Sequence, residues 1–387
     1  MNTSYAGIAI VAVGAFAALA GCGQDTSELA ETTPVASVGQ AVRSAVKDGE
    51  HKFDHVAPTG NGRACATCHV EADAFTLKPE HVEARFAALP RDASGRIVSY
   101  ESDPLFQSID ADDFEHDFTR LRQGLARVTI DLPSNVTVDE LPGARKISLF
   151  RAVPSIQNVA FTGPYLSDRR AVTLQDQALG AAIGHIQTKR APDSAFLDAV
   201  AAYELVQFSS DRVRFVSNEL AAGRNPARAE RALNAEEQQG RDVFNTRCSQ
   251  CHGGSTLNNG PVPTFVSRTL GVSVSRLNQT NLPVYTFRFQ TPNGVVALRS
   301  PDPGHALQSG NPNLATEFET FDVPTLYGIA NTAPYFHDNS APTLEAVVQH
   351  YQEDFAFAKM IGVPDPAVQT PFTDEEMRLM VVYMKTL

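Results

Sequence analysis

The feature that most constrains this chain is a five-residue motif, Cys-x-x-Cys-His, which occurs once in each half. This spacing is the signature of c-type haem attachment. Both sulfurs bond to one edge of the porphyrin, and the histidine that follows reaches the iron as its proximal ligand. The motifs therefore predict two covalently bound haems. The attachment residues are Cys65, Cys68, Cys248 and Cys251, and the proximal ligands are His69 and His252.

Other uses of paired cysteines fit the pattern less well. A zinc ribbon places its Cys-x-x-Cys units about 15–20 residues apart, whereas Cys68 and Cys248 are 180 positions apart. A thioredoxin-like site has one pair in a βαβ setting, and structural disulfides occur in exported proteins. None of these alternatives explains a histidine directly after both pairs.

The N-terminus has the pattern of an export signal. The apolar run Ile8–Ala20 is too short to span a bilayer, and it leads into Leu-Ala-Gly-Cys at residues 19–22. This tetrapeptide resembles the bacterial lipobox, in which the cysteine becomes the lipidated first residue of the mature chain. We expect residues 1–21 to be a lipoprotein signal peptide, Cys22 to be lipidated, and residues 22–42 to form a polar tether. The alternative is an ordinary signal peptide with an incidental cysteine.

A lipid on Cys22 would anchor the protein to a membrane without spanning it. The predicted location is the periplasmic side of a bacterial membrane. Residue 23 is glycine, not the aspartate associated with inner-membrane retention, so we expect the outer membrane.

An internal repeat divides the rest of the chain. Residues 153–174 and 323–344 align without gaps, with ten of 22 positions identical, and each copy follows one haem motif. We therefore predict two homologous haem domains, residues 43–223 and 224–387, in which the repeat is a loop around its own haem.

Local patterns predict several helices. Residues 196–220 are apolar at helical intervals. Asn234 and Thr373 are each followed three residues later by glutamate, which is typical of a helix N-terminus. Residues 92–139 are read as an irregular acidic excursion. Residues 253–313 form a long stretch rich in Gly, Pro, Asn and Thr, of a kind that often lines a site.

The net charge of −12 over 387 residues makes nucleic acid an unexpected partner. An acidic surface can attract a basic redox protein, although many soluble proteins are acidic for solubility alone.

The two haem motifs and the two repeats together resemble the bacterial di-haem cytochrome c peroxidases and their MauG-type relatives. The resemblance covers about residues 52–387, apart from the acidic excursion. It implies a mainly α fold of two cytochrome c-like haem domains related by a pseudo-twofold axis, with long loops. It also implies that hydrogen peroxide reacts at the first haem. The second haem would relay electrons from a small redox protein, such as a cytochrome or cupredoxin, or from an oxidised protein substrate.

The resemblance assigns residues around the first haem. A glutamine of the family is kept as Gln177. The family's tryptophan between the haems is replaced by Ser167, and its distal glutamate by Gln187, which cannot transfer protons as a carboxylate does. His185 is the candidate acid–base group or sixth iron ligand in this segment, and His81 is its rival as ligand.

For the second haem, the resemblance places the sixth ligand at Tyr351, where many members have methionine and MauG-type members have tyrosine. A phenolate oxygen favours ferric iron, whereas methionine favours ferrous iron. His350 and Met360 are the other candidates. Thr332 and Pro334 match positions whose carbonyls bind calcium in the family, while the asparagine that joins them there is Ala152 here.

Two functions remain open from the sequence. The first is a peroxide-reducing di-haem oxidoreductase. The second is a di-haem electron-transfer protein with both irons six-coordinate and no peroxide chemistry, which Ser167 and Gln187 favour. A haem-based redox sensor is a third, weaker reading.

Overall fold

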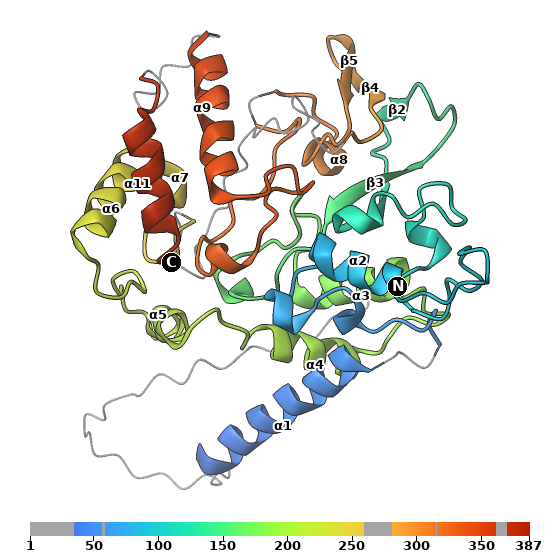
Figure 1. Ribbon diagram of the computed structural model, residues 1–387, viewed down its shortest axis with the longest axis horizontal. Coiled ribbons are helices and arrows are strands. Elements are labelled where there is room, and N and C mark those ends of the chain that lie inside the picture. The colour runs from blue at the N-terminus through green and yellow to red at the C-terminus, as the bar shows by residue number, and fades with distance from the viewer. Residues whose placement is uncertain (1–34, 56–58, 259–280, 315, 361–369) are drawn as a thin grey trace, which may run out of the picture.

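The computed structural model describes residues 35–55, 59–258, 281–314, 316–360 and 370–387 (Figure 1). Helices dominate, with two small sheets beside them, which confirms the expected mainly α class. The helices are α1 (Val35–Asp54), α2 (Pro79–Ala87), α3 (Leu174–Gly184), α4 (Ser194–Glu204), α5 (Asp211–Ala221), α6 (Ala235–Arg247), α7 (Ser249–His252), α8 (Ala306–Ser309), α9 (Leu344–Met360) and α11 (Asp374–Met384). The strands are β1 (Leu125–Asp131), β2 (Val136–Val138), β3 (Lys146–Ala152), β4 (Tyr285–Thr291) and β5 (Gly294–Ser300).

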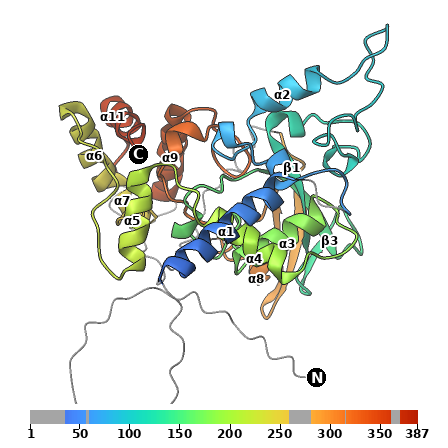
Figure 2. The same cartoon turned by 90° about the horizontal axis from the view of Figure 1, so that it is seen from below.

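The first half is built on a close crossing of α1 and α4 (Figure 2). Gly49 of α1 faces α4, where a Cβ atom would overlap the carbonyl oxygen of Ala199 and lie 2.8 Å from the Cβ of Tyr203. Only glycine allows this approach. One turn later, the buried ring of Phe53 packs on Tyr203, with centroids 5.1 Å apart.

The second half repeats this arrangement with α6 and α11. Gly240 of α6 lies against the backbone of Leu379. A Cβ atom at this position would lie 3.0 Å from the Cβ of Tyr383. Phe244 packs on Tyr383 with centroids 5.2 Å apart. Both crossings thus use Gly-x-x-x-Phe on one helix and a tyrosine on the other. Two related helical units are present, as the sequence repeat predicted.

Helix α1 begins before residue 43, where the sequence reading placed the start of the first domain. Val46, Gly49 and Phe53 share one helical face toward α4, and the helix extends back to Val35. Residues 35–42 are therefore helical and do not form part of the predicted tether, whose remainder lies outside the described residues. None of the helices in the described part combines the length and apolarity needed to cross a bilayer.

Two predicted helix starts are confirmed and one predicted helix is divided. Asn234 accepts from the amide of Glu237 at 2.9 Å, and Thr373 accepts from that of Glu376 at 3.1 Å. The stretch 196–220 is not one helix but parts of α4 and α5. The chain breaks between them because Ser210 caps α5 by accepting from the amide of Val213.

The segments read as irregular contain all the described strands but β3. β1 pairs antiparallel with β3, and β4 pairs with both β2 and β5. Phe287 and Phe289 of β4 point inward and Arg288 points out, the alternation of a half-buried strand. Because β2 precedes the first repeat and β4 precedes the second, this sheet joins the two halves. Its core contains Ile130, Leu132, Val136, Val138, Ile147, Leu149, Phe287, Phe289, Ala306, Leu307 and Phe318.

Candidate functional site

Each Cys-x-x-Cys-His motif forms one tight helical turn. The first turn is a 3₁₀ helix at Cys65–Thr67, and the second is α7, directly after α6. The histidine amide donates to the carbonyl of the first cysteine in both, at 3.0 Å for His69 and 2.8 Å for His252. None of the four motif cysteines forms a disulfide. The turn gathers two sulfurs and one imidazole, and the disulfide alternative finds no support.

The two histidines are held in the same way. Nδ1 of His69 lies 3.1 Å from the carbonyl oxygen of Phe75, and Nδ1 of His252 lies 3.1 Å from that of Leu257. Because a carbonyl only accepts, Nδ1 carries the hydrogen and the Nε2 lone pair is left for a metal. Burial lowers the pKa of both imidazoles to about 4, which keeps them in the neutral, ligating form.

Each repeat holds the loop that follows its own histidine. Ser155 Oγ donates to the carbonyl of Ala74 at 2.6 Å, and Thr325 Oγ1 donates to that of Thr256, also at 2.6 Å. These equivalent bonds show that the repeat encloses the motif of its own half.

One cavity of about 650 Å³ contains both histidines. Its lining includes residues 152–159 and 321–327 of the two repeat regions and is largely apolar. A neutral imidazole donor at each end and an apolar lining fit two flat macrocycles attached at the two turns. The residues present are therefore suited to haem.

His185 follows α3 and lies near the first histidine. Its carbonyl accepts from Asn61 Nδ2 at 3.0 Å and from Arg63 Nη1 at 3.3 Å. The two imidazoles are close enough that His185 contributes to lowering the pKa of His69. Burial lowers the pKa of His185 itself, and Asp110 opposes that effect. The structure thus brings together His185 and His69, as the sequence predicted.

A buried ion pair supports this distal region. Arg63 Nη1 lies 2.6 Å from Asp110 Oδ2, and each side chain is at most 2 % exposed. Arg63 also donates to the carbonyl of Leu105, and Asp110 accepts from the amide of Arg127 at 2.6 Å. Sequence reasoning missed both partners. Asp110 is one of many acids in residues 92–139, and no local pattern marks it as buried.

The three positions compared with the family, Ser167, Gln177 and Gln187, do not all lie at the cavity. Gln177 lines the cavity, and its Oε1 is buried without a hydrogen-bond partner among the described residues. Ser167 also lines the cavity. Gln187 is exposed instead, where its Oε1 accepts from Asn61 Nδ2 at 3.0 Å. Of the two predicted glutamines, only Gln177 faces the cavity.

Glu204, the last residue of α4, is a cavity residue that the sequence reading missed. It is 3 % exposed and lines the same cavity as His69 and Gln177. Burial raises its pKa to about 8. A lone carboxylate within the apolar run Ala199–Val206 was the signal available in the sequence.

Tyr351 of α9 lies in the second half of the cavity, near Cys248 and Cys251, and burial raises the pKa of its phenol. His350 is not among the lining residues, and its Nε2 lies 2.8 Å from Asp354 Oδ2. The side chain of Met360 lies outside the described residues. The sulfur of Met380, a buried residue of the cavity lining, is 3.9 Å from Cys248 Sγ.

His81 lies away from this arrangement. It is in the first turn of α2, with Nδ1 3.4 Å from Asp73 Oδ2, and its side chain is 37 % exposed. It does not line the cavity. His185 is not among the cavity-lining residues either, but its imidazole is close enough to that of His69 to lower the pKa of His69, which favours His185 over His81 as the distal histidine.

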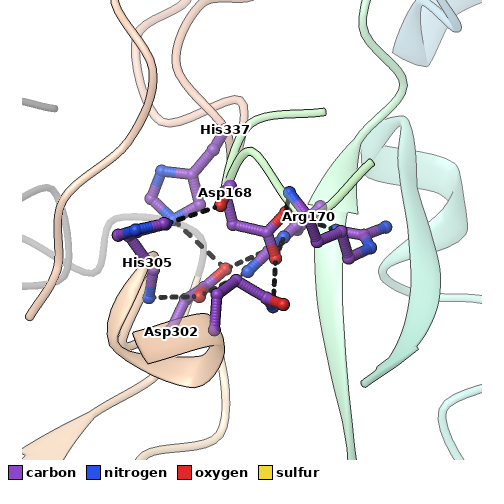
Figure 3. A network of polar contacts seen from close by, with 8 residues as sticks. Asp168, Arg170, Asp302, His305 and His337 are labelled. Carbon is purple, nitrogen blue, oxygen red and sulfur yellow. Dashed lines mark hydrogen bonds and ion pairs between the residues drawn. The ribbon is translucent and has the colours of Figure 1, made fainter. Parts of the chain in front are cut away.

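A buried polar network lies beside the cavity and joins the two repeats (Figure 3). Arg151 of β3 contacts Asp168 of the first repeat at 2.7 Å and Asp302 through two bonds of 2.6 and 2.9 Å. Arg170 contacts Asp168 at 2.8 Å, and His337 of the second repeat lies 3.8 Å from Asp302. Burial alone would raise the pKa of Asp168, but Arg151 and Arg170 together lower it.

Two further predictions concern calcium and the lipid. Thr332 and Pro334, the two expected calcium positions, line the cavity, and so does Ala152, which stands where the family has asparagine. Calcium itself stays a prediction. Cys22 lies outside the described residues.

Comparison with known proteins gives matches to solved structures only; no family model and no curated protein matches the sequence. A MauG-like protein associated with microbial copper homeostasis aligns over 89% of this chain and 88% of that chain, with 18% identity and a TM-score of 0.50. The diheme peroxidase BthA from Burkholderia thailandensis E264 aligns over 89% and 86%, with 14% identity and a TM-score of 0.46. Hydrazine synthase from Kuenenia stuttgartiensis aligns over 96% and 99%, with 15% identity and a TM-score of 0.44. At these identities the first match establishes the fold.

Proposed function

Because the chain has the fold of a MauG-like protein, we propose that it is a di-haem c-type oxidoreductase that reduces hydrogen peroxide. The observation that carries the proposal is the pair of equivalent Cys-x-x-Cys-His turns on one cavity, each presenting the Nε2 atom of a neutral histidine. Cys65 and Cys68 would attach the first haem, and Cys248 and Cys251 the second. Each haem would supply an iron that exchanges one electron at a time.

Peroxide reduction consumes two protons and two electrons and yields two water molecules. We assign the proton transfer to His185. Its lowered pKa leaves the imidazole neutral at pH 7, so it can take up a proton and return it. The buried Arg63–Asp110 pair holds the His185 backbone in place through Arg63. Gln187 has no exchangeable carboxyl proton and is exposed, so it takes no part.

The electrons would come from a small redox protein, such as a cytochrome or cupredoxin, or from an oxidised side chain of a protein substrate. Tyr351 as an anionic oxygen ligand favours the second source, because it stabilises the oxidised states of iron. The net charge of −12 favours a basic partner. The carbonyls of Thr332 and Pro334 would hold a calcium ion.

We place the protein on the periplasmic side of the outer membrane, anchored through a lipid on Cys22. A Cys22→Ser variant is then expected in the soluble periplasmic fraction. Recovery of this variant with membranes, as for the wild type, would contradict the anchor.

A di-haem electron-transfer protein without peroxidase activity is the alternative. Two observations favour it: Gln187 faces solvent, and the position of the family tryptophan is Ser167 in a chain without tryptophan. Both irons would then carry two protein ligands, with no open position for peroxide.

Absorption spectroscopy of the ferric protein separates the two functions. The oxidoreductase should show a high-spin component that reacts with hydrogen peroxide. Purely low-spin spectra that peroxide leaves unchanged would support the electron carrier. Mass determination under denaturing conditions should first show two added haems.

His185→Ala is expected to slow the peroxide reaction by about 10²–10⁴-fold, the usual contribution of a positioned acid–base group. His81→Ala is the matched control, since it removes an exposed histidine from the same half. Equal rates in both variants would remove His185 from the reaction.

A further inference from the structure

The carboxyl group of Glu204 has no partner to stabilise its charge. Its Oε2 is buried and makes no hydrogen bond in the described part of the chain, and none of the ion pairs found there includes it. A buried carboxylate without a cation is costly and is kept neutral instead. Because Glu204 is 3 % exposed, solvent does not relieve this cost.

The helical packing does not require a carboxyl group at this position. The two helix crossings match Ala199 to Leu379 and Tyr203 to Tyr383, so Glu204 of α4 corresponds to Met384 of α11. Met384 is 5 % exposed and lines the same cavity. Where the second half has an apolar side chain, the first half has an acid in an equivalent environment.

The groups that face Glu204 belong to the first haem site. Its charge acts on Cys65, an attachment cysteine, and on Tyr165 of the first repeat. Asp54 at the end of α1 also acts on Cys65. Gln177 of α3 is a further cavity residue with an unpartnered buried oxygen. Asp54 is acidic and the other neighbours are neutral, so none of these groups supplies a positive charge that would stabilise the Glu204 carboxylate.

Building on the proposed function, we propose that Glu204 is the proton acceptor linked to reduction of the first haem. When an electron from the redox partner enters that haem, the site gains one negative charge, and the Glu204 carboxylate takes up one proton from solvent. Oxidation reverses both transfers. The net charge of the buried site is thereby unchanged. One proton is held beside the first haem, which peroxide is expected to oxidise.

The pKa of Glu204, raised to about 8 by burial, is consistent with this role, because above that pH the carboxylate form is present and can accept a proton. Added negative charge at the haem raises that pKa further, which is the coupling that the proposal requires.

The test is a spectroelectrochemical titration of the holoprotein between pH 5 and 10. In the wild type, the potential of one haem should fall as pH rises above about 8, where the oxidised protein loses the Glu204 proton and the reduced protein keeps it. The expected slope approaches a tenfold change in the reduction equilibrium per pH unit, equivalent to about 59 mV for a one-electron couple. Glu204→Gln and Glu204→Met should both lose most of this slope. Glu219→Gln, which removes a half-buried carboxyl of α5 that is paired with Arg224, should keep it.

Haem propionates titrate in every variant, so the difference between wild type and Glu204→Gln is the decisive quantity. Equal slopes in these two proteins would overturn the proposal. Because the potentials are measured without peroxide, an inert ferric spectrum together with a Glu204-dependent slope would reject the peroxidase function and retain the proton coupling. A chain that binds no haem would reject both.

Discussion

The second half of the cavity offers two kinds of iron ligand, the phenol of Tyr351 and the thioethers of Met380 and Met384. Burial raises the pKa of Tyr351, so without a nearby cation its phenol stays protonated at neutral pH. A ferric iron would supply the positive charge that stabilises the phenolate. The choice of ligand therefore depends on the oxidation state that the site maintains.

Tyr351→Phe removes the oxygen donor and leaves the ring. We expect the potential of one haem to rise and the charge-transfer absorption of the ferric protein to change, because an anionic ligand that favours ferric iron is lost. The control is Tyr335→Phe, a tyrosine of the same cavity whose hydroxyl donates to the carbonyl of Ile329 at 2.9 Å. Unchanged potentials and spectra in Tyr351→Phe would show that iron uses another ligand.

Residues tied to a fixed spacing from the haem motifs or repeats could be predicted from the sequence. His185 and Tyr351 were found in this way, and the structure places both near their motif. Asp110 and Arg63 could not be found, because their pairing joins segments that only the tertiary fold brings together. Gln187 was assigned to the distal site by its count along the chain, but its backbone is in the left-handed region, with φ of 55°, and its side chain is exposed.

At the scale of elements, the two helix crossings need glycine because it has no side chain, whereas turns need it for its backbone conformation. Gly49 and Gly240 lie in regular helices, where glycine is unfavourable by itself. They are kept because the carbonyls of Ala199 and Leu379 come too close for a side chain. The loss of helix propensity is offset by close packing of α1 on α4 and of α6 on α11.

Gly49→Ala is expected to lower the free energy of unfolding by about 1–3 kcal/mol, the usual cost of overpacking. Gly180→Ala provides the comparison. Gly180 lies in the middle of α3, and a Cβ atom there would meet no other atom within 4 Å. Removing backbone freedom from the unfolded chain should stabilise this variant by about 0.4–1 kcal/mol. Denaturant unfolding of both holoproteins measures the difference, and a neutral Gly49→Ala would refute the close crossing.

One of the sheet elements could have been predicted from the sequence, and one strand pairing could not. Residues 285–291 alternate apolar and polar side chains, and the turn sequence Pro-Asn-Gly and the apolar run 295–298 follow them. This pattern is typical of a β-hairpin, yet the overall Gly, Pro and Asn content was read as a loop. By contrast, the pairing of β2 with β4 joins residues about 150 positions apart. No local pattern specifies that partner.

Across the whole molecule, the Arg151 network fastens the first repeat to the segment before the second. Arg151→Met would leave Asp168 and Asp302 buried without their main cation, so we expect a loss of about 3–5 kcal/mol in the free energy of unfolding. Arg288→Met is the control, because its pair with Asp139 is exposed and such pairs contribute at most about 1 kcal/mol. Similar losses in the two variants would mean that the network does not hold the halves together.

The buried acids also determine how the stability of the whole molecule changes with pH. Glu204 has a pKa of about 8 in the folded chain and an ordinary value of 4.5, so between these limits the folded state binds a proton that the unfolded state has lost. Stability must therefore fall as pH rises through this window, by up to about 1.4 kcal/mol per pH unit. Burial raises the pKa of Asp322 to about 6, so this group also makes stability fall as pH rises. Most of its effect is complete above pH 6.

Comparison above pH 6 isolates Glu204 from Asp322. Between pH 6.5 and 8.5, the wild type should lose stability relative to Glu204→Gln, measured as the denaturant midpoint of each protein at both pH values. The glutamine variant has no proton to lose, so its stability should change less over the same interval. Parallel changes in the two proteins would mean that Glu204 is charged throughout, which its burial among Cys65, Tyr165 and Gln177 argues against.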